Sequence, residues 1–220
     1  MEELAADVYV LQGFPKYAVN AYLIGGILVD SRLRFMRHSL ISQLRGRRLD
    51  AHVLTHAHPD HQGNSHTICS TFGISLWCGL RDAPAMERGP LSALLPDSLT
   101  NRLLAACMGG GCHPVARRLR EGDRVGDFTT IETPGHTPGH ISLWREADRT
   151  LILGDVLANQ HPITQKVGLM EPLTRFTLGP VRNRQSARAV AALGPRLVCF
   201  GHGPPLRDPA SLRAFVAGLA

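Results

Sequence analysis

The chain has 220 residues, of which 44% are hydrophobic and 19% are charged. This composition excludes a disordered or low-complexity chain, and we expect a single domain over residues 1–220. No run of about 18 apolar residues occurs, so we expect no membrane-spanning segment. The formal net charge of +6 is compatible with an anionic partner, but the arginines are dispersed along the chain, which favours a solvated arginine-rich surface.

The N-terminus and the cysteines together favour a cytoplasmic location. The first residues, MEELAADVYV, lack the basic segment and apolar core of a secretory signal. The five cysteines are odd in number and show no C-x-x-C spacing. We therefore expect free thiols in a reducing compartment.

The first third of the chain is predicted to contain short strands separated by helices. Strands are predicted where apolar residues alternate or run continuously, at 7–13, 20–26, 27–30, 51–56 and 74–79. Helices are predicted where apolar residues recur at helical spacing, at 34–48 and 63–72.

A second block of strands is predicted after a stretch of helices and loops at 81–120. The further strands or hairpins are expected at 124–136, 140–155 and 196–203, and the further helices at 184–193 and from 208 onward. Residues 155–180 are expected to be irregular. Each cluster of His and Asp residues follows a predicted strand, in a loop, which is where functional sites are usually built.

The segment THAHPDH is the densest of these clusters. Residues two apart in an extended segment face the same side, so we expect His56, His58 and Asp60 to project into one cavity. Pro59 has a fixed φ and favours extended geometry at His58, whereas His61 lies where the chain turns into the next helix. Imidazole nitrogens and carboxylate oxygens suit zinc, and also iron or manganese.

Three more candidate ligands lie downstream, beside glycines or at strand ends. They are His136 in TPGHTPGH, Asp155 in LILGD and His202 in CFGHG. Glycine beside a ligand lets the backbone approach a crowded centre. With the four residues of THAHPDH, these candidates exceed the needs of one tetrahedral ion and suit two ions with a bridging carboxylate.

This ordered set resembles the ligand pattern of the metallo-β-lactamase superfamily of metal-dependent hydrolases. The resemblance runs from the first histidine cluster to the last and so covers most of the chain. It implies an α+β fold, a four-layer αβ/βα sandwich of two mixed β-sheets flanked by helices. It also implies a metal site at one edge of the sandwich.

The resemblance further implies roles for individual residues. The ligands implied for the first metal are His56, His58 and His136, and those for the second are Asp60, His61 and His202. Asp155 would bridge the two ions, and Asp30 would orient ligands without binding metal. Two divalent ions, zinc in the first instance and iron or manganese otherwise, would share a hydroxide that attacks the substrate. Asp60 would also act as the catalytic residue that steers this nucleophile or relays a proton.

The substrate class is narrowed only in part. Asp155 argues against true metallo-β-lactamases, which generally lack a bridging aspartate, and the chain is too short for the inserted domain of β-CASP nucleases. Glyoxalase II-like thioesterases match the ligand set well, although their C-terminal helical extension is missing. We therefore expect a hydrolase of a small ester, thioester or lactone, without a membrane or nucleic-acid partner. A phosphodiesterase or nucleic-acid-processing enzyme, and a mononuclear-iron persulfide dioxygenase, remain the alternatives.

Several other residues have simpler interpretations. His140 is expected to be a hydrogen-bonded packing residue rather than an eighth ligand, and His52 to be structural or exposed. Residues 158–180 lie between the last two ligands and are expected to form a wall or lid of the pocket. The apolar residues of this segment, together with Lys166 and Arg175, would suit an acyl substrate with a carboxylate, but the two cations could equally contact phosphate or face water.

Overall fold

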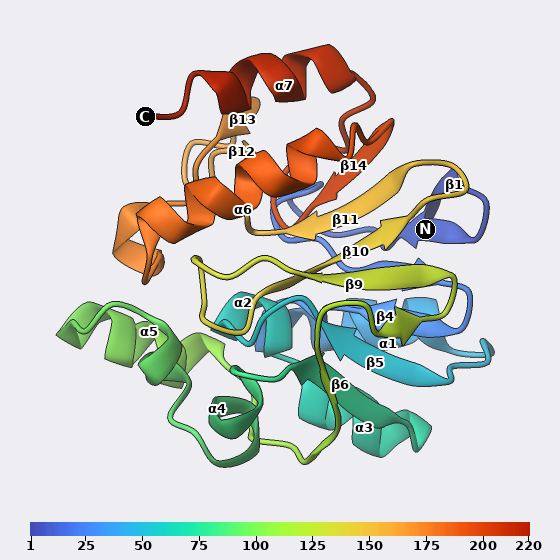
Figure 1. Ribbon diagram of the computed structural model, residues 1–220. Helices are drawn as coiled ribbons and strands as arrows, with labels where there is room; N and C mark the ends of the chain where they lie inside the picture. Colours follow the sequence, from blue (N-terminus) through green and yellow to red (C-terminus); the bar gives the residue numbers. More distant parts are fainter.

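The computed structural model describes residues 1–220 as four layers, in which two β-sheets pack face to face between helices (Figure 1). The larger sheet follows chain order and consists of β1 (Glu2–Ala5), β2 (Val8–Val10), β3 (Tyr22–Ile24), β4 (Ile27–Val29), β5 (Ala51–Leu54), β6 (Ser75–Gly79) and β7 (Val115–Leu119). Its strands are antiparallel from β1 to β4 and parallel from β4 to β7. The sheet is therefore mixed, as expected.

The smaller sheet is mixed as well, with the strand order β14-β11-β10-β9-β8. Its strands are β8 (Arg124–Val125), β9 (Phe128–Glu132), β10 (Ile141–Arg145), β11 (Thr150–Gly154) and β14 (Leu197–Phe200). Only β14 runs parallel to its neighbour, β11. A separate pair, β12 (Ala158–Gln160) and β13 (Val167–Met170), is antiparallel.

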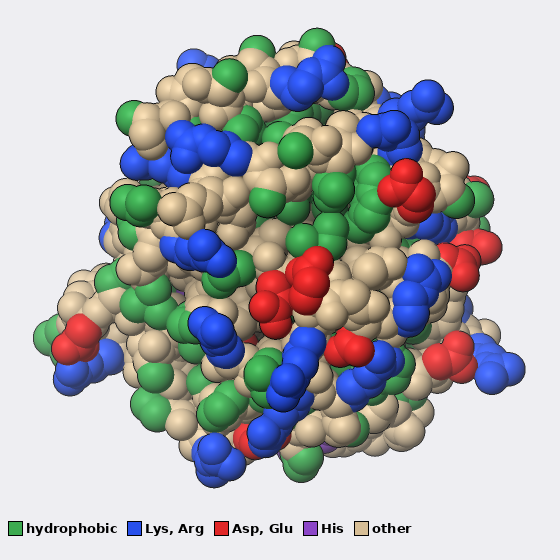
Figure 2. All heavy atoms as spheres, viewed as in Figure 1, with side chains coloured by type: hydrophobic (Ala, Val, Ile, Leu, Met, Phe, Trp, Pro, Cys, Tyr) green, Lys and Arg blue, Asp and Glu red, His purple; other side chains and the backbone are tan.

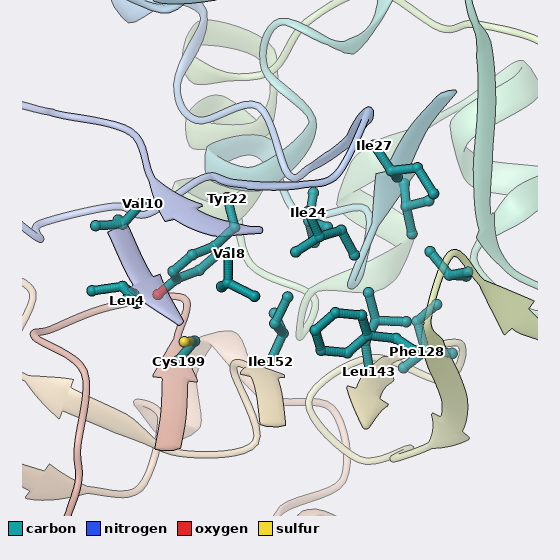
Figure 3. Packing of buried hydrophobic residues seen from close by; sticks show 14 of the residues in the cluster. Leu4, Val8, Val10, Tyr22, Ile24, Ile27, Phe128, Leu143, Ile152 and Cys199 are labelled. Atoms are coloured by element: carbon teal, nitrogen blue, oxygen red, sulfur yellow. The ribbon is translucent and has the colours of Figure 1, made fainter. Parts of the chain in front are cut away.

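The main core lies between the two sheets. It is a cluster of 17 buried residues from both sheets. Figure 3 shows Tyr22 and Ile24 of the larger sheet facing Cys199, Ile152 and Phe128 of the smaller one. Complete burial of one such aliphatic or aromatic side chain contributes about 1.5–3 kcal/mol. Burial of these inward faces therefore holds the sheets together.

The helices cover the outer faces of the sheets. They are α1 (Arg37–Leu44), α2 (Pro59–Gln62), α3 (Ser65–Phe72), α4 (Ala83–Arg88), α5 (Leu99–Met108), α6 (Pro180–Ala192) and α7 (Pro209–Ala217), with 3-10 turns η1 (Arg34–Met36), η2 (Leu91–Leu94) and η3 (Thr174–Phe176). Leu40 and Leu44 of α1 and Ile68 of α3 pack on the larger sheet, while α6 and α7 pack on the smaller one (Figure 1). No helix combines the length and apolar character needed to cross a bilayer. The expected four-layer α+β sandwich is confirmed.

Some predicted elements are wrong, and each has a local reason. Strand β7 falls in the segment expected to be helix and loop, because its sequence, VARRL, lies at the sheet edge and shows little apolar patterning. The β12–β13 pair falls in the segment 155–180 that was expected to be irregular. Helix α6 begins at Pro180 rather than at 184, since proline is favoured in the first turn of a helix.

Candidate metal centre

The candidate ligands meet because four strands end at one edge of the sandwich. Asp30 follows β4 and His56 lies just beyond β5, and these two strands are parallel neighbours. Asp155 follows β11 and His202 lies just beyond β14, which are the parallel pair of the other sheet. His136 comes from the loop between β9 and β10. The fold thus brings together side chains that are far apart in the sequence.

The THAHPDH segment changes conformation within itself. His58 is extended, with φ −68° and ψ 154°, and the chain enters α2 at Pro59. Asp60 and His61 therefore lie in the first turn of α2. His58 and Asp60 line one cavity, as expected, but Asp60 reaches it from a helix and not from an extended segment. The proline at the first helical position explains the early start. Asp60 faces His202, with 3.2 Å between Oδ2 and Nε2.

The side chains form three groups whose potential ligand atoms lie within 4.8 Å of one another. These groups are His56 with His58 and His136, His56 with His61 and Asp155, and Asp60 with His61 and His202. The first and third groups are the two sets implied by the resemblance. Oδ2 of Asp155 lies between them, 3.4 Å from Nε2 of His61, 3.6 Å from Nε2 of His136 and 3.2 Å from Nε2 of His202. A carboxylate in this position can act as a metal ligand for both groups.

Hydrogen bonds to protein groups fix one nitrogen of each histidine ring. Nδ1 of His61 donates to Oδ2 of Asp30 at 2.9 Å, and Nε2 of His58 donates to the Leu94 carbonyl at 2.8 Å. Nδ1 of His136 lies 3.0 Å from Oγ1 of Thr177. Such bonds set the ring orientation, and they leave the other nitrogen as the one that can bind a metal ion when it is unprotonated.

His56 and His202 are held in the same way. Nδ1 of His56 lies 3.1 Å from Oγ1 of Thr55, whose hydroxyl donates to Asp30 at 2.8 Å. Nδ1 of His202 donates to the carbonyl of Ala18. Asp30 also accepts from the backbone N–H of Thr55. Its role as a residue that orients ligands, rather than as a ligand, therefore fits its contacts.

The chemistry of the cluster fits divalent cations. Nε2 of His56, His61 and His136 and Oδ1 of Asp155 are buried without a hydrogen-bond partner. Unpaired buried polar atoms cost about 1–3 kcal/mol each. The three ring nitrogens lie 3.4–3.9 Å from Oδ2 of Asp155, so their lack of hydrogen-bond partners fits a site for a cation. Carboxylate and imidazole ligands suit zinc, iron and manganese alike.

Electrostatics at the centre lead to the same conclusion. Burial raises the pKa of Asp155, but the adjacent rings of His202 and His61 hold it well below its usual range. Burial lowers the pKa of His202, but the carboxylates of Asp155 and Asp60 raise it to about 10. Burial and neighbouring rings hold the pKa of His56 well below its ordinary value. The carboxylates are therefore ionised, and protons on rings or bound cations must balance their charge.

Crowding at the centre explains one of the glycines beside His202. A Cβ atom added at Gly201 would overlap the carboxylate of Asp155 and lie 2.7 Å from Cε1 of His61. Only glycine lets β14 end this close to the ligands. The predicted use of glycine for close backbone approach is thus confirmed at this position.

Two polar residues outside the predicted set hold the ligand loops in place. His140 accepts from the backbone N–H of Asp155 at Nε2, and its Nδ1 lies 2.8 Å from Oγ1 of Thr133, so the expected packing role is confirmed. Asp82 was not singled out in the sequence, because an isolated aspartate before a helix carries no distinctive signal. Its buried carboxylate accepts from the N–H of Ala57 and from the hydroxyl of Thr137.

A cavity of about 530 Å³ opens onto the candidate ligands. Asp60, His136, Asp155 and His202 contribute to its lining. Many of its other lining residues are apolar and come from the loop before β3, from α5 and from the segment between β12 and α6. The expectation that residues 158–180 form a wall of the pocket is confirmed, and a substrate bound there would meet the ligands directly.

Comparison with known proteins agrees with this geometry. The chain is 29% identical over 200 residues to the probable metallo-hydrolase YflN of Bacillus subtilis, covering 82% of this chain and 76% of YflN. It is 32% identical over 125 residues to the hydroxyacylglutathione hydrolase of Bdellovibrio bacteriovorus, covering 54% of this chain and 39% of that hydrolase.

Solved structures show the same architecture. The metallo-beta-lactamase family protein TTHA1429 from Thermus thermophilus superposes with a TM-score of 0.72 at 25% identity, covering 98% of this chain and 80% of that one. The protein TTHA1623, crystallised in a di-iron-bound form, superposes with a TM-score of 0.66 at 27% identity, covering 86% and 89%. The family model of the metallo-beta-lactamase superfamily matches residues 15–202. The chain therefore belongs to the metallo-beta-lactamase superfamily of metal-dependent hydrolases.

Proposed function

We propose that this protein hydrolyses a small ester, thioester or lactone at a centre of two divalent metal ions. The observation that carries the proposal is the position of Asp155, whose carboxylate lies between two histidine groups at the floor of a largely apolar cavity. In this proposal His56, His58 and His136 hold one ion, and Asp60, His61 and His202 hold the other. Bound divalent ions would lower the pKa of a water molecule and polarise the substrate carbonyl.

The exposure of the ligands supports a catalytic role for Asp60. Its side chain is 32% exposed and lines the cavity, whereas the side chains of His56 and His61 are fully buried. Asp60 is therefore accessible to a substrate in the cavity. Its carboxylate would take the proton of the water and later return it to the departing oxygen or sulfur.

The proposed reaction is an ordinary hydrolysis and needs no further reactant. The water oxygen bonds to the acyl carbon, and the bond from that carbon to the alkoxy oxygen or thioester sulfur breaks. The products are the carboxylic acid and an alcohol or thiol, or a hydroxy acid from a lactone. The buried network around Asp30 would keep the ligand rings aligned during these steps.

Similarity to a hydroxyacylglutathione hydrolase supports the thioester branch of the proposal. The surface gives no comparable support for a nucleic-acid substrate. On the face shown in Figure 2, lysine and arginine side chains are scattered among acidic and apolar ones. A polynucleotide substrate would require several cations aligned to neutralise phosphates, and its binding would fall steeply with salt.

Metal analysis combined with an activity panel tests the proposal. We expect two ions per chain after saturation with zinc, measured by mass spectrometry, and turnover of a neutral ester, a thioester or a lactone but not of a phosphodiester. Activity should vary weakly with salt. Saturation at one iron ion with oxygen consumption on a glutathione persulfide would favour the dioxygenase alternative, and steeply salt-dependent cleavage of a phosphodiester would favour the nuclease alternative.

A further inference from the structure

The lining of the cavity contains one arginine and no lysine. Leu104 and Met108 of α5, with Leu173 and Phe176 of the adjoining segment, supply apolar surface. Arg175 lines the same cavity and is exposed at its surface. The pocket thus combines apolar walls with a positive charge, in addition to the candidate metal ligands.

This charge is not neutralised by a neighbouring carboxylate. Glu171 also lines the cavity, but both of its oxygens accept hydrogen bonds from Arg184, with N–O distances of 2.7 and 3.1 Å. Arg175 itself makes no ion pair or side-chain hydrogen bond with a protein group. Lys166, the other cation that the sequence placed in this segment, is exposed and does not line the cavity. Arg175 is therefore the only arginine or lysine in the lining.

The position of Arg175 is fixed by its surroundings. The buried side-chain amide of Asn101 donates to the backbone carbonyl of Arg175 at 2.9 Å and to that of Pro96 at 2.8 Å. The guanidinium packs on the ring of Phe176, with Cζ 4.6 Å from the ring centroid. An arginine ordered in this way loses less side-chain entropy when it binds an anion.

We propose that Arg175 binds a carboxylate at the far end of the acyl group, so that the preferred substrate is an ester, thioester or lactone with an apolar chain ending in a carboxylate. This inference rests on the proposed hydrolase function. A planar guanidinium matches a carboxylate through two parallel hydrogen bonds. A phosphate monoester carries close to two charges and is better served by several cations, and a single arginine therefore favours the carboxylate.

Two esters of equal length provide the direct test. 4-Nitrophenyl hexanoate has a neutral chain, and the mono-4-nitrophenyl ester of adipic acid has the same number of carbons and a terminal carboxylate. We define the preference as the ratio of kcat/KM for the adipate ester to that for the hexanoate. In Arg175→Gln this preference should fall by about tenfold or more, as expected for loss of a hydrogen bond to a charged group.

Two further variants separate charge recognition from a change in shape. Arg47→Gln removes an exposed arginine that lies outside the cavity, and it should leave the preference unchanged. Arg175→Glu should reverse the selectivity toward the ester of 6-aminohexanoic acid, whose chain ends in an ammonium group. An unchanged preference in Arg175→Gln, or no reversal in Arg175→Glu, would overturn the proposal.

Binding measurements keep this inference separate from the hydrolase proposal. Calorimetric titration with monomethyl adipate and with hexyl phosphate does not depend on turnover. Weaker binding of monomethyl adipate to Arg175→Gln than to the wild type would support the anion site, even if no ester were hydrolysed. Equal binding by the two proteins would refute it while leaving the hydrolase function intact. Tighter Arg175-dependent binding of hexyl phosphate would overturn the carboxylate assignment.

Discussion

Asp82 offers a sharp test of how the candidate metal centre is held together. Its carboxylate is fully buried and receives three hydrogen bonds. Oδ2 accepts from the N–H of Ala57 at 3.0 Å and from the hydroxyl of Thr137 at 2.7 Å, while Oδ1 accepts from the N–H of Gly139 at 2.7 Å. Ala57 lies between two candidate ligands, and Thr137 directly follows a third. One carboxylate therefore fastens the two loops that would hold the first ion.

The structure sets the size of the expected effect. In Asp82→Ala three buried donors lose their acceptor, and each unsatisfied donor costs about 1–3 kcal/mol. Burial raises the pKa of Asp82, which shows that burying this carboxylate is itself unfavourable. Removing the carboxylate in the variant also removes this cost. We therefore expect a loss near the lower end of the sum, about 3 kcal/mol in the free energy of unfolding. Because the ligand loops would be less firmly held, the affinity for the first ion should also fall by about 10–100-fold.

Urea denaturation of the metal-free protein measures the stability, and competition with a chromogenic chelator measures the affinity for each ion. Leu212→Ala is the matched control, because Leu212 is buried in α7 on the outside of the smaller sheet. Leu212→Ala should lower the free energy of unfolding by about 2–5 kcal/mol through loss of packing. It should leave the affinity for each metal ion unchanged. If Asp82→Ala bound the first ion as tightly as Leu212→Ala does, the proposed fastening role would be refuted.

Three further predictions concern the site and the core. His202→Ala should lower the metal content toward one ion per chain, since its Nε2 faces two carboxylates. Asp155→Ala should lose both ions and activity together, and mass-spectrometric retention of two ions would contradict its bridging role. The ring of His52 lies between the Leu28 carbonyl and the Ser65 hydroxyl, and burial lowers its pKa to about 4. The unfolded chain therefore takes up a proton at this residue first as the pH falls below about 6.5. His52 alone should then contribute a loss of about 2 kcal/mol in the free energy of unfolding between pH 7.5 and pH 5, measured by urea denaturation as the difference between the wild type and His52→Gln. His52→Gln should lack this component.

The candidate centre was largely predictable because each ligand lies next to a recognisable strand. Apolar runs mark β5, β11 and β14, and the His or Asp residues just beyond them carry the sequence signal. The exception is the backbone at Asp60, which the alternation along the segment predicted to be extended. Pro59 starts α2 one residue after His58, and helical geometry then turns Asp60 toward His202.

The residues that support the ligands could not be predicted in the same way. Asp82 and Thr177 are single polar residues without a motif, and the groups of the ligand loops that they contact are 25 to 57 positions away along the chain. Only the packed structure brings them to the ligand loops. The edge strand β7 escaped detection for a related reason, because charged and small residues along it give no regular apolar face.

The segment that forms the pocket wall also contacts the candidate ligand His136. The Thr177 hydroxyl donates to the carbonyl of Leu173 at 3.1 Å and lies 3.0 Å from Nδ1 of His136. Arg175 lies between Leu173 and Thr177, in the 3-10 turn η3, and its carbonyl is held by Asn101 of α5. A substrate that engages Arg175 would therefore order the same turn that aims His136. Under this proposal, recognition of the acyl group and alignment of the candidate metal centre would be coupled through one short piece of backbone.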